Sequence, residues 1–262
     1  MRLKDKIALI TGSSTGIGEA IARALVREGA KVMIHGLDAA EAEGVAADLR
    51  KGGASAMSFA GDIGEPSVCA KLVAATAERL GGLNVLVNNA AIKTRDSIET
   101  ATVETFDRTM AINLRAPFLL SQAAMAHFRK AGGGSILNIG SGNGYCGECS
   151  QLTYSISKGG LTTLTRNLAD AHGTEGVRVN QLNVGWVLSK NEYELKIKEG
   201  LPPDWPQKVA PVFAPSGALN TPEEVAHFAL MFILPEGTRV NGSVVDLEQY
   251  PWIGRNPQKY TK

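Results

Sequence analysis

The chain has 262 residues, of which 44% are hydrophobic and 20% charged, and its 27 Lys and Arg against 26 Asp and Glu give a formal net charge of +1. This balance, without basic clusters or a run of the ~20 apolar residues that span a bilayer, argues against nucleic acid or membrane as a partner. Three cysteines cannot all pair, which favours a reducing compartment, and we expect a cytoplasmic protein.

Short apolar runs alternate with longer amphipathic stretches along the whole chain. The runs that predict strands are Ile7–Ile10, Lys31–His35, Ala56–Ala60, Val85–Val87, Ser135–Ile139, Val177–Leu182 and Ser243–Asp246. Helical periodicity covers Ile17–Glu28, Ala39–Arg50, Glu65–Leu80, Leu114–Lys130, Thr153–His172 and Pro222–Phe232. This alternation predicts a Rossmann-type doubly wound α/β sheet of about seven parallel strands with helices on both faces, which binds its ligand at the carboxyl ends of the strands.

The domain organisation follows from the absence of any linker rich in Pro, Gly or Ser. We expect residues 1–262 to form a single domain. Residues 186–219 break the strand–helix rhythm and contain five prolines. So long an irregular segment is uncommon in a compact domain, and it is typical of a lid over a site.

A glycine-rich turn directly follows the first predicted strand and leads into an Ala-rich helix. Glycine allows sharp turns and close approach to a ligand, and the start of the helix offers free N–H groups to an anion such as a pyrophosphate. Because strand, turn and helix come in this order, the turn predicts a dinucleotide site. Its candidate binding residues are Gly12, Ser14, Thr15, Gly16, Ile17 and Gly18.

Two further segments follow the third and fourth predicted strands. Asp62 and Ile63 come after the third strand, where the carboxylate either accepts the adenine amino group or caps the next helix. Asn89 and Ala90 come after the fourth strand. They either brace the sheet edge beside the cofactor or simply form a turn.

The candidate catalytic group consists of Ser141, Tyr154 and Lys158. Tyr154 and Lys158 are four residues apart in a predicted helix and therefore share one face. An ammonium group near a phenol favours the phenolate, so we expect Lys158, and further a bound cationic nicotinamide, to lower the pKa of Tyr154 towards the working pH. Ser141 follows the fifth strand, where its hydroxyl can hydrogen-bond a substrate oxygen and polarise a carbonyl.

Together these motifs resemble the single-domain branch of the short-chain dehydrogenase/reductase family. The matching pieces, in order, are Thr11-Gly12-x-x-x-Gly16-x-Gly18, Asn88-Asn89-Ala90, Asn113, Ser141 and Tyr154-x-x-x-Lys158. The resemblance implies that Tyr154 is the general acid/base, Ser141 the donor to the substrate oxygen, and Lys158 a pKa modulator and ribose ligand. It also implies that Asn113 holds a water that relays protons to Lys158, and that the chain forms a homotetramer or homodimer.

The resemblance also bears on the cofactor. It places the backbone of Val187 against the nicotinamide carboxamide, and Ser189 where a threonine commonly touches the cofactor. NADP-binding relatives tend to carry a basic residue at position 15 or just after the second strand, but this chain has Thr15 and Leu37 there. With no cation for a 2′-phosphate and Asp38 close by, we expect NAD to be preferred, with NADP as the alternative.

The substrate is expected to be a small molecule, and the candidate pocket mixes polar with aromatic side chains, which suits a hydroxylated compound. Asn143, Tyr145 and Trp186 are the leading pocket residues beside Ser141, and Glu148, Gln151, Asn191 and Trp205 are further candidates. Cys146 and Cys149 have a Cys-x-x-Cys spacing, but a zinc site needs further ligands and the four histidines supply no partner motif, so no metal is expected. We expect the tail after Asp246, with Tyr250 and Trp252, to dock on its own or a neighbouring subunit.

The predicted function is hydride transfer between a nicotinamide cofactor and a secondary alcohol or ketone, with a sugar or polyol as the favoured substrate. The alternative within enzymes is an NADPH-dependent ketoreductase of acyl-type carbonyls. A different class is a non-catalytic, NAD(P)-binding regulatory protein, against which the complete set of candidate catalytic residues argues.

Overall fold

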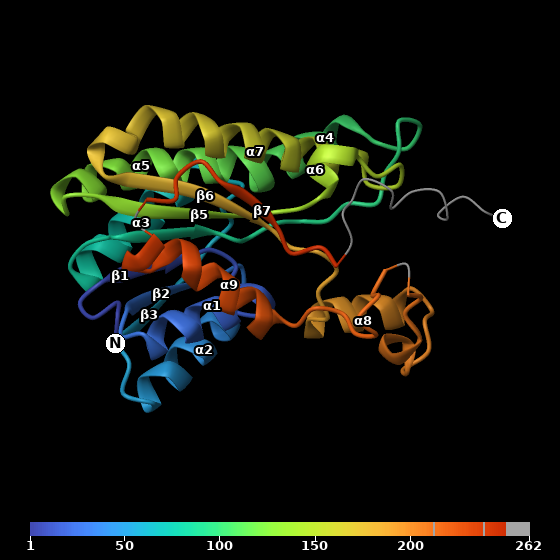
Figure 1. Cartoon of the computed structure of the whole chain (residues 1–262), viewed down its shortest axis with the longest axis horizontal. Coiled ribbons are helices and arrows are strands. Elements are labelled where there is room, and N and C mark those ends of the chain that lie inside the picture. Colours follow the sequence, from blue (N-terminus) through green and yellow to red (C-terminus); the bar gives the residue numbers. More distant parts are fainter. Residues whose placement is uncertain (212, 238, 250–262) are drawn as a thin grey trace.

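A twisted, seven-stranded parallel sheet forms the centre of the computed structural model, which describes residues 1–211, 213–237 and 239–249 (Figure 1). Its strands are β1 (Ile7–Ile10), β2 (Lys31–Gly36), β3 (Ala56–Ala60), β4 (Val85–Asn88), β5 (Gly134–Gly140), β6 (Val177–Asn183) and β7 (Val244–Asp246). They lie in the order β3-β2-β1-β4-β5-β6-β7, and every neighbouring pair is parallel. The predicted fold class is confirmed.

Helices cover both faces of the sheet and enclose two hydrophobic cores. One face carries α1 (Gly16–Arg27), α2 (Ala39–Lys51) and α9 (Pro222–Ile233). The other carries α3 (Pro66–Leu80), α5 (Ala116–Lys130) and α7 (Leu152–His172), and Figure 1 shows the two layers on opposite sides of the strands. No helix in the described ranges is both long and apolar enough to cross a membrane.

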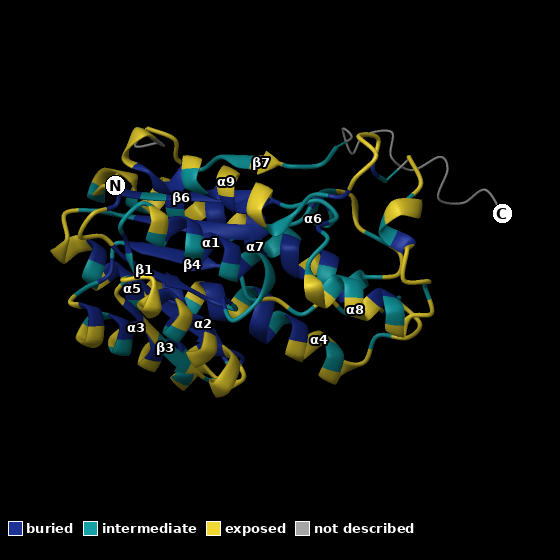
Figure 2. Cartoon of the chain, turned by 90° about the horizontal axis from the view of Figure 1, so that it is seen from below, coloured by how far each residue is buried: buried dark blue, intermediate teal, exposed yellow. Residues whose placement is uncertain are grey.

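The central strands are continuous apolar runs because they are buried on both faces. In β1, Ala8 and Ile10 pack into one core and Ile7 and Leu9 into the other, as the alternation of strand side chains requires. Figure 2 shows the strands at the centre as buried and most of the exposed residues on the outer faces of the helices.

Three helices were missing from the sequence prediction. They are α4 (Val103–Met110), α6 (Asn143–Cys146) and α8 (Lys190–Lys198). Each has at most 9 residues, which gives too few turns for a clear periodic signal. A π-helical turn, Ala111–Arg115, joins α4 to α5, so that α5 begins at Ala116 rather than at Leu114.

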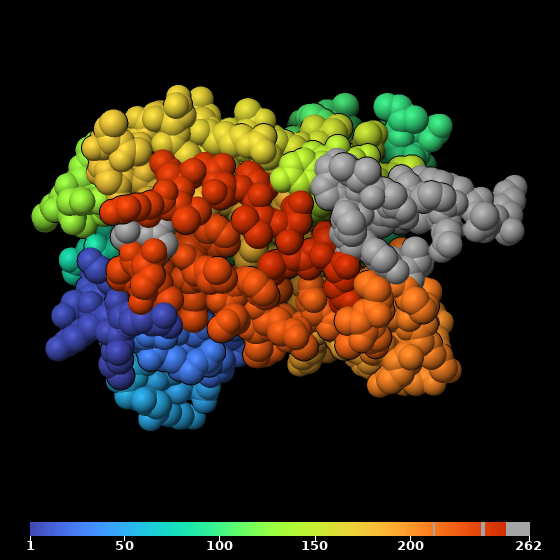
Figure 3. All heavy atoms as spheres, in the orientation of Figure 1, coloured from blue at the N-terminus to red at the C-terminus, as the bar shows by residue number. Residues whose placement is uncertain are grey.

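The segment 186–219 is structured rather than an irregular loop. It contains α8 and a 3₁₀ turn at Trp205–Lys208. Trp205, Ala214 and Leu219 form a small hydrophobic cluster separate from the two cores of the sheet. Figure 3 shows this segment, in orange, as a lobe that projects from the body of the molecule.

A chain of hydrogen-bonded polar side chains crosses the sheet from β4 to β7; it is buried as far as Asn183 of β6 and ends at the exposed Asp246. Asn88 donates to Asn138 at 2.8 Å, and Asn138 donates to Thr165 of α7 at 2.8 Å. Beyond Thr165 the chain continues through Gln181 and Asn183, and Asn183 donates to Asp246 at 2.7 Å. Because buried polar groups are costly unless they are paired, this chain favours one register of the strands.

The described part of the tail docks on its own subunit. The backbone N–H of Leu247 donates to the Asn183 carbonyl at 2.9 Å, and the Ser216 hydroxyl donates to Gln249 Oε1 at 2.8 Å. Tyr250 and Trp252, on which the docking prediction also relied, lie outside the described residues.

We predict that Asn138→Ala lowers the free energy of unfolding by about 2–4 kcal/mol, because it leaves the amide of Asn88 and the hydroxyl of Thr165 without their buried partner. Urea denaturation measures the change, with the exposed Thr163→Ala on α7 as the control. A loss within ~0.5 kcal/mol, the range of ordinary surface substitutions, would contradict this role for the polar chain.

Candidate active site

Two adjoining cavities lie at the carboxyl ends of the strands. The first, of about 360 Å³, follows the glycine turn and the ends of β2 to β4, and the second, of about 480 Å³, lies beside Ser141 and Tyr154. Ile17 and Ser189 line both. We call the first the cofactor cleft and the second the substrate cavity.

The glycine turn has the geometry of a dinucleotide cradle. Gly12 and Gly16 have φ angles of +61° and +59°, which favour glycine, and a Cβ on Gly18 would lie 2.3 Å from the Gly12 carbonyl oxygen. Thr15 is the N-cap of α1 but makes no side-chain capping bond, which leaves first-turn N–H groups available to a ligand. The predicted residues Gly12, Ser14, Thr15, Gly16 and Ile17 all line the cleft, so the cradle fits a pyrophosphate.

His35, which was not among the predicted site residues, fixes the glycine turn through a hydrogen bond to its backbone. Its ring is buried, the Gly12 N–H donates to Nδ1 at 3.2 Å, and Nε2 lies 3.0 Å from the Gly61 carbonyl oxygen. Because Nδ1 accepts and Nε2 donates, the ring is neutral. Burial lowers the pKa of His35 and outweighs the opposing effects of the Gly61 bond and the Asp62 charge.

Asn89 and Asp62 shape the opposite side of the cofactor cleft. Asn89 Nδ2 donates to the carbonyl oxygens of Thr11 and Gly12 at 2.9 and 3.0 Å, so it braces the glycine turn. Asp62 accepts from the Gly64 N–H at 2.8 Å and forms a 2.8 Å ion pair with Arg108.

The cap interpretation of Asp62 is wrong, because the N-cap of α3 is Glu65. Burial acts to raise the pKa of Asp62, but the Arg108 and Gly64 bonds hold it below its usual value. Arg108, a further residue of the cleft, was not predicted because its helix α4 was not. The predicted Leu37, Ile63 and Ala90 line the cleft as well.

The structure brings Ser141 and Tyr154 together at the substrate cavity, with Lys158 buried behind them. Ser141 follows β5 and forms a hydrogen bond with Tyr154, which lies in the first turn of α7. Lys158 Nζ donates to the Ile139 carbonyl at 2.8 Å and lies 5.6 Å from the centroid of the Tyr154 ring.

The expected lowering of the pKa of Tyr154 by Lys158 alone is wrong for this structure, and the further lowering by a bound nicotinamide stays a prediction. Burial raises the pKa of Tyr154 to about 12, the Ser141 hydrogen bond acts against this, and the charge of Glu192 adds to it. Burial also lowers the pKa of Lys158 to about 8. Both shifts have the same origin, since an apolar environment disfavours the charged form of either side chain.

Asn113 lies in the π-helical turn and ties together three parts of the site. Its Oδ1 accepts from the Ile92 N–H at 2.9 Å, and its Nδ2 donates to the Ile92 carbonyl at 2.9 Å and to Ser157 at 3.1 Å. The side chain thereby fixes the loop after β4 against α7. The water relay implied for Asn113 stays a prediction.

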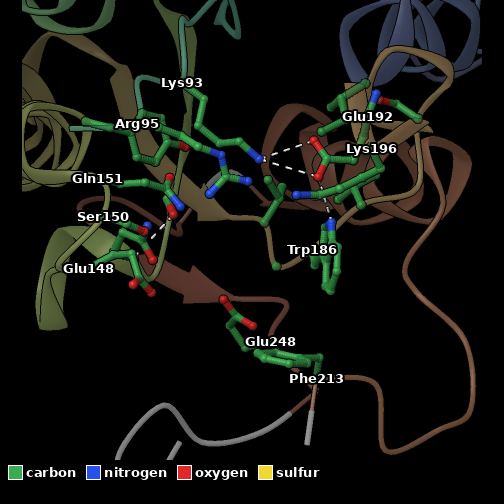
Figure 4. A pocket seen from close by; sticks show the side chains of 18 residues that line it. Lys93, Arg95, Glu148, Ser150, Gln151, Trp186, Glu192, Lys196, Phe213 and Glu248 are labelled. Atoms are coloured by element: carbon green, nitrogen blue, oxygen red, sulfur yellow. Dashed lines mark hydrogen bonds and ion pairs between the residues drawn. The ribbon is translucent and has the colours of Figure 1, made fainter. Parts of the chain in front are cut away.

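Most of the predicted substrate residues line the substrate cavity (Figure 4). Those that do are Ser141, Asn143, Glu148, Gln151 and Trp186. Val187 and Ser189, predicted for the cofactor, also line it, and Ser189 caps α8 by accepting from the Glu192 N–H at 3.1 Å.

Three predicted pocket residues lie elsewhere. Tyr145 forms its side-chain hydrogen bond with Asn183 and does not line the cavity. Trp205 is buried in the hydrophobic cluster of the lobe. Asn191 lines the cofactor cleft, where it accepts from the Thr15 hydroxyl at 3.3 Å.

Ion pairs between α8 and the loop after β4 complete the substrate cavity, and sequence reasoning missed them. Lys93 Nζ lies 3.2 Å from Glu192 Oε2, and Arg95 Nε lies 2.9 Å from Glu199 Oε1. Lys196 also pairs with Glu199, at 2.6 Å. Lys93 and Arg95 are 99 and 104 positions from their partners Glu192 and Glu199, so no local pattern relates them.

The Cys-x-x-Cys pair and a metal site are the two remaining features considered in the sequence. Cys146 and Cys149 are exposed, and Cys146 Sγ donates to the Gly142 carbonyl at 3.4 Å. Within residues 1–211, 213–237 and 239–249, no group of three or more His, Cys, Asp and Glu side chains is arranged to hold a metal ion.

Comparisons with known proteins place this geometry in a family. A family model described as short chain dehydrogenase matches residues 6–200. The 2-(S)-hydroxypropyl-CoM dehydrogenase 3 of Xanthobacter autotrophicus is 35% identical over 92% of this chain and 94% of its own, and the galactitol 2-dehydrogenase of Agrobacterium fabrum is 31% identical over 97% and 100%. The structure of L-sorbose reductase from Gluconobacter frateurii, complexed with NADPH and L-sorbose, aligns with a TM-score of 0.90 at 26% identity, covering 95% of this chain and 97% of that one.

We predict that the free energy of unfolding falls as the pH drops below about 6.5, partly through His35. Its pKa in the folded chain lies below its ordinary value of 6.5, so between the two values the unfolded chain binds a proton that the folded chain does not. The contribution has a slope of at most ~1.4 kcal/mol per pH unit.

Urea denaturation from pH 7.5 to 5.0 tests this by comparison with His35→Asn, which cannot titrate there. The wild type should lose more stability than the variant as the pH falls. Parallel curves for the two proteins would show that His35 is not responsible.

Proposed function

The chain belongs to the short-chain dehydrogenase family and is an NAD(P)-dependent oxidoreductase that acts on CH–OH groups; from this premise we propose that its substrate is a polyol or a sugar, interconverted between secondary alcohol and ketone. The observation that carries the proposal is the lining of the substrate cavity. Charged and amide side chains surround Ser141 and Tyr154, and Trp186 and Phe213 add aromatic faces. Such a mixture suits a substrate with many hydroxyl groups.

In this proposal Tyr154 is the general acid/base. In alcohol oxidation its phenolate takes the proton of the substrate hydroxyl, and in ketone reduction its phenol returns the proton to the carbonyl oxygen. Ser141 donates a hydrogen bond to the same oxygen and polarises it. Lys158 holds an ammonium group close to the phenol and fixes α7 against the end of β5 through Ile139.

The cofactor would lie in the cleft along the glycine turn, with Asp62 at its adenine end and Val187 and Ser189 at the junction with the substrate cavity. When bound, the nicotinamide supplies the hydride acceptor or donor, and its oxidised form carries a positive charge that favours the phenolate of Tyr154.

We propose NAD as the preferred cofactor. Among the described residues that line the cleft, the one Lys or Arg is Arg108, which is already paired with Asp62. Asp38 caps α2 through its carboxylate at the end of β2, close to Leu37, and a carboxylate there opposes a 2′-phosphate. NADP remains the alternative, since the sorbose reductase structure holds NADPH.

Two other proposals come from the sequence. Residues 186–219 are proposed to act as a lid, which their position at the junction of both cavities supports. A homodimer or homotetramer is supported by exposed apolar side chains on the outer faces of α5 and α7, such as Phe118 and Ile156. The charged lining of the cavity argues against an acyl chain as substrate.

Tyr154→Phe is expected to lower kcat by at least about 10²–10⁴-fold, because the ring keeps its place but cannot transfer a proton. Cofactor affinity, measured by quenching of protein fluorescence, should be retained. Tyr145→Phe is the matched control, since it removes a phenol hydroxyl outside the cavity. Near-normal turnover in Tyr154→Phe would overturn the mechanism.

The substrate and cofactor proposals are tested by following the absorbance of the reduced cofactor with polyols, aldoses and simple secondary alcohols, using NAD⁺ and NADP⁺ in parallel. We expect turnover of a polyol or sugar with NAD⁺. Activity confined to acyl-type ketones with NADPH would replace this proposal with the ketoreductase alternative.

We predict that Leu37→Arg raises kcat/KM for NADP⁺ about tenfold, because a guanidinium at the end of β2 can pair with the 2′-phosphate. Initial rates with each cofactor at a fixed concentration of the same alcohol measure the change. No gain with NADP⁺ would show that the cleft places the ribose elsewhere.

A further inference from the structure

Resting on the proposed function, we propose that the Lys93–Glu192 ion pair is a substrate subsite that recognises a vicinal diol. The diol consists either of the reacting carbinol and its neighbouring hydroxyl or of the next two hydroxyls along the carbon chain of the substrate. Lys93 lies in the loop after β4 and Glu192 in α8, and Figure 4 shows their charged ends meeting inside the substrate cavity.

Several hydrogen bonds hold the long side chains of Lys93 and Glu192 in place. Lys93 Nζ lies 3.2 and 3.5 Å from the two oxygens of Glu192, and Trp186 Nε1 donates to Glu192 Oε1 at 2.8 Å. The side chains of Lys93 and Glu192 are only 33% and 13% exposed. Withdrawing such charges from water is unfavourable, which indicates a role beyond that of an ordinary surface ion pair.

The loop that carries Lys93 is anchored on both sides. Before Lys93, the backbone N–H and carbonyl of Ile92 are both bound by the side chain of Asn113. After it, buried Asp96 accepts from the Thr153 N–H at 3.1 Å, next to Tyr154 in sequence. The position of the ammonium group is therefore tied to the helix that carries Tyr154.

The pair also lies close to the reacting centre. Glu192, Lys93, Ser141 and Tyr154 line the same cavity, and the negative charge of Glu192 acts on the Tyr154 phenol. A substrate whose oxygen meets Tyr154 and Ser141 can therefore reach the pair with its neighbouring carbons inside this one cavity.

The chemistry of the pair matches two adjacent hydroxyls. A hydroxyl both donates and accepts, the ammonium group only donates, and the carboxylate only accepts. One hydroxyl can accept from Lys93 while its neighbour donates to Glu192, and the Trp186 ring offers an apolar face to the C–H groups between them. A lone hydroxyl can make only part of this contact, so the pair selects polyols over simple alcohols.

The second ion pair on α8 provides an internal comparison. Arg95 and Glu199 also join the loop after β4 to the end of α8. Arg95 lines the cavity, but Glu199, which is shared with Lys196, does not. Loss of the Arg95–Glu199 pair should loosen α8 without removing the diol contact. Comparing variants of the two pairs therefore distinguishes loss of substrate recognition from loosening of α8.

The test compares Lys93→Met, Glu192→Gln and Glu199→Gln for kcat/KM with the hexitol galactitol and with butan-2-ol, with NAD⁺ and NADP⁺ each saturating. The ratio of the two values is the readout, because a shift in the pKa of Tyr154 or a looser lobe affects both alcohols alike. Lys208→Met, which removes an exposed lysine of the lobe paired with Asp204, is the matched control for loss of charge.

We expect the ratio to fall about 10- to 100-fold in Lys93→Met and Glu192→Gln, mainly through the KM for galactitol, as expected for loss of a hydrogen bond to a charged group. It should stay unchanged in Glu199→Gln and Lys208→Met. Butane-2,3-diol should lose its advantage over butane-1,3-diol in the first two variants.

Two results would overturn the proposal, and they can be told apart. If the wild type prefers galactitol and Lys93→Met and Glu192→Gln keep that preference, the subsite is wrong and the proposed function stands. If the wild type itself shows no preference for galactitol over butan-2-ol, the polyol function fails and the subsite fails with it.

Discussion

The parallel pairing of all seven strands is the constraint on which the rest of the structure depends. Parallel strands all end at the same edge, and their connections cross the faces of the sheet as helices. One edge of the sheet therefore collects residues that are far apart in sequence, and 175 positions separate Gly12 from Val187. These residues are the glycine turn after β1, Asp62 after β3, Asn89 after β4, Ser141 after β5 and Val187 after β6. Register matters equally, since a shift of one residue would reverse the faces of a strand.

Precise backbone hydrogen bonding turns that edge into a site. His35 and Asn89 hold the glycine turn from two sides, and Asn113 holds Ile92 by both its N–H and its carbonyl. These side chains use their hydrogen-bonding groups on the protein itself. They fix the loops so that the residues expected to touch ligand, such as Ser141 and Tyr154, start from defined positions.

Motifs that are local in sequence could be predicted, and contacts between distant segments could not. The strands, the long helices and the glycine turn each follow from a periodicity or a spacing within about 20 residues. Lys93 and Glu192 come together only because α8 folds back over the loop after β4, and nothing near either residue indicates it. The prediction that Tyr145 lines the substrate cavity is wrong for a related reason. Tyr145 lies near Ser141 in sequence, but its side chain is directed by its hydrogen bond to Asn183 on β6. The pKa of Tyr154 likewise depends on burial, which spacing alone does not reveal.

Within residues 186–219, Trp205, Ala214 and Leu219 form a small cluster of their own, while Val187 packs into one core of the sheet. If the lobe selects the substrate as proposed, stability of the sheet and substrate choice depend largely on different side chains. Substitutions in the lobe other than at Val187 would then leave the cores of the sheet intact and Tyr154, the proposed general acid/base on α7, in place. Such a division lets one catalytic scaffold diversify into enzymes for many alcohols by remodelling a segment of about 30 residues, which is an economical route to new specificity.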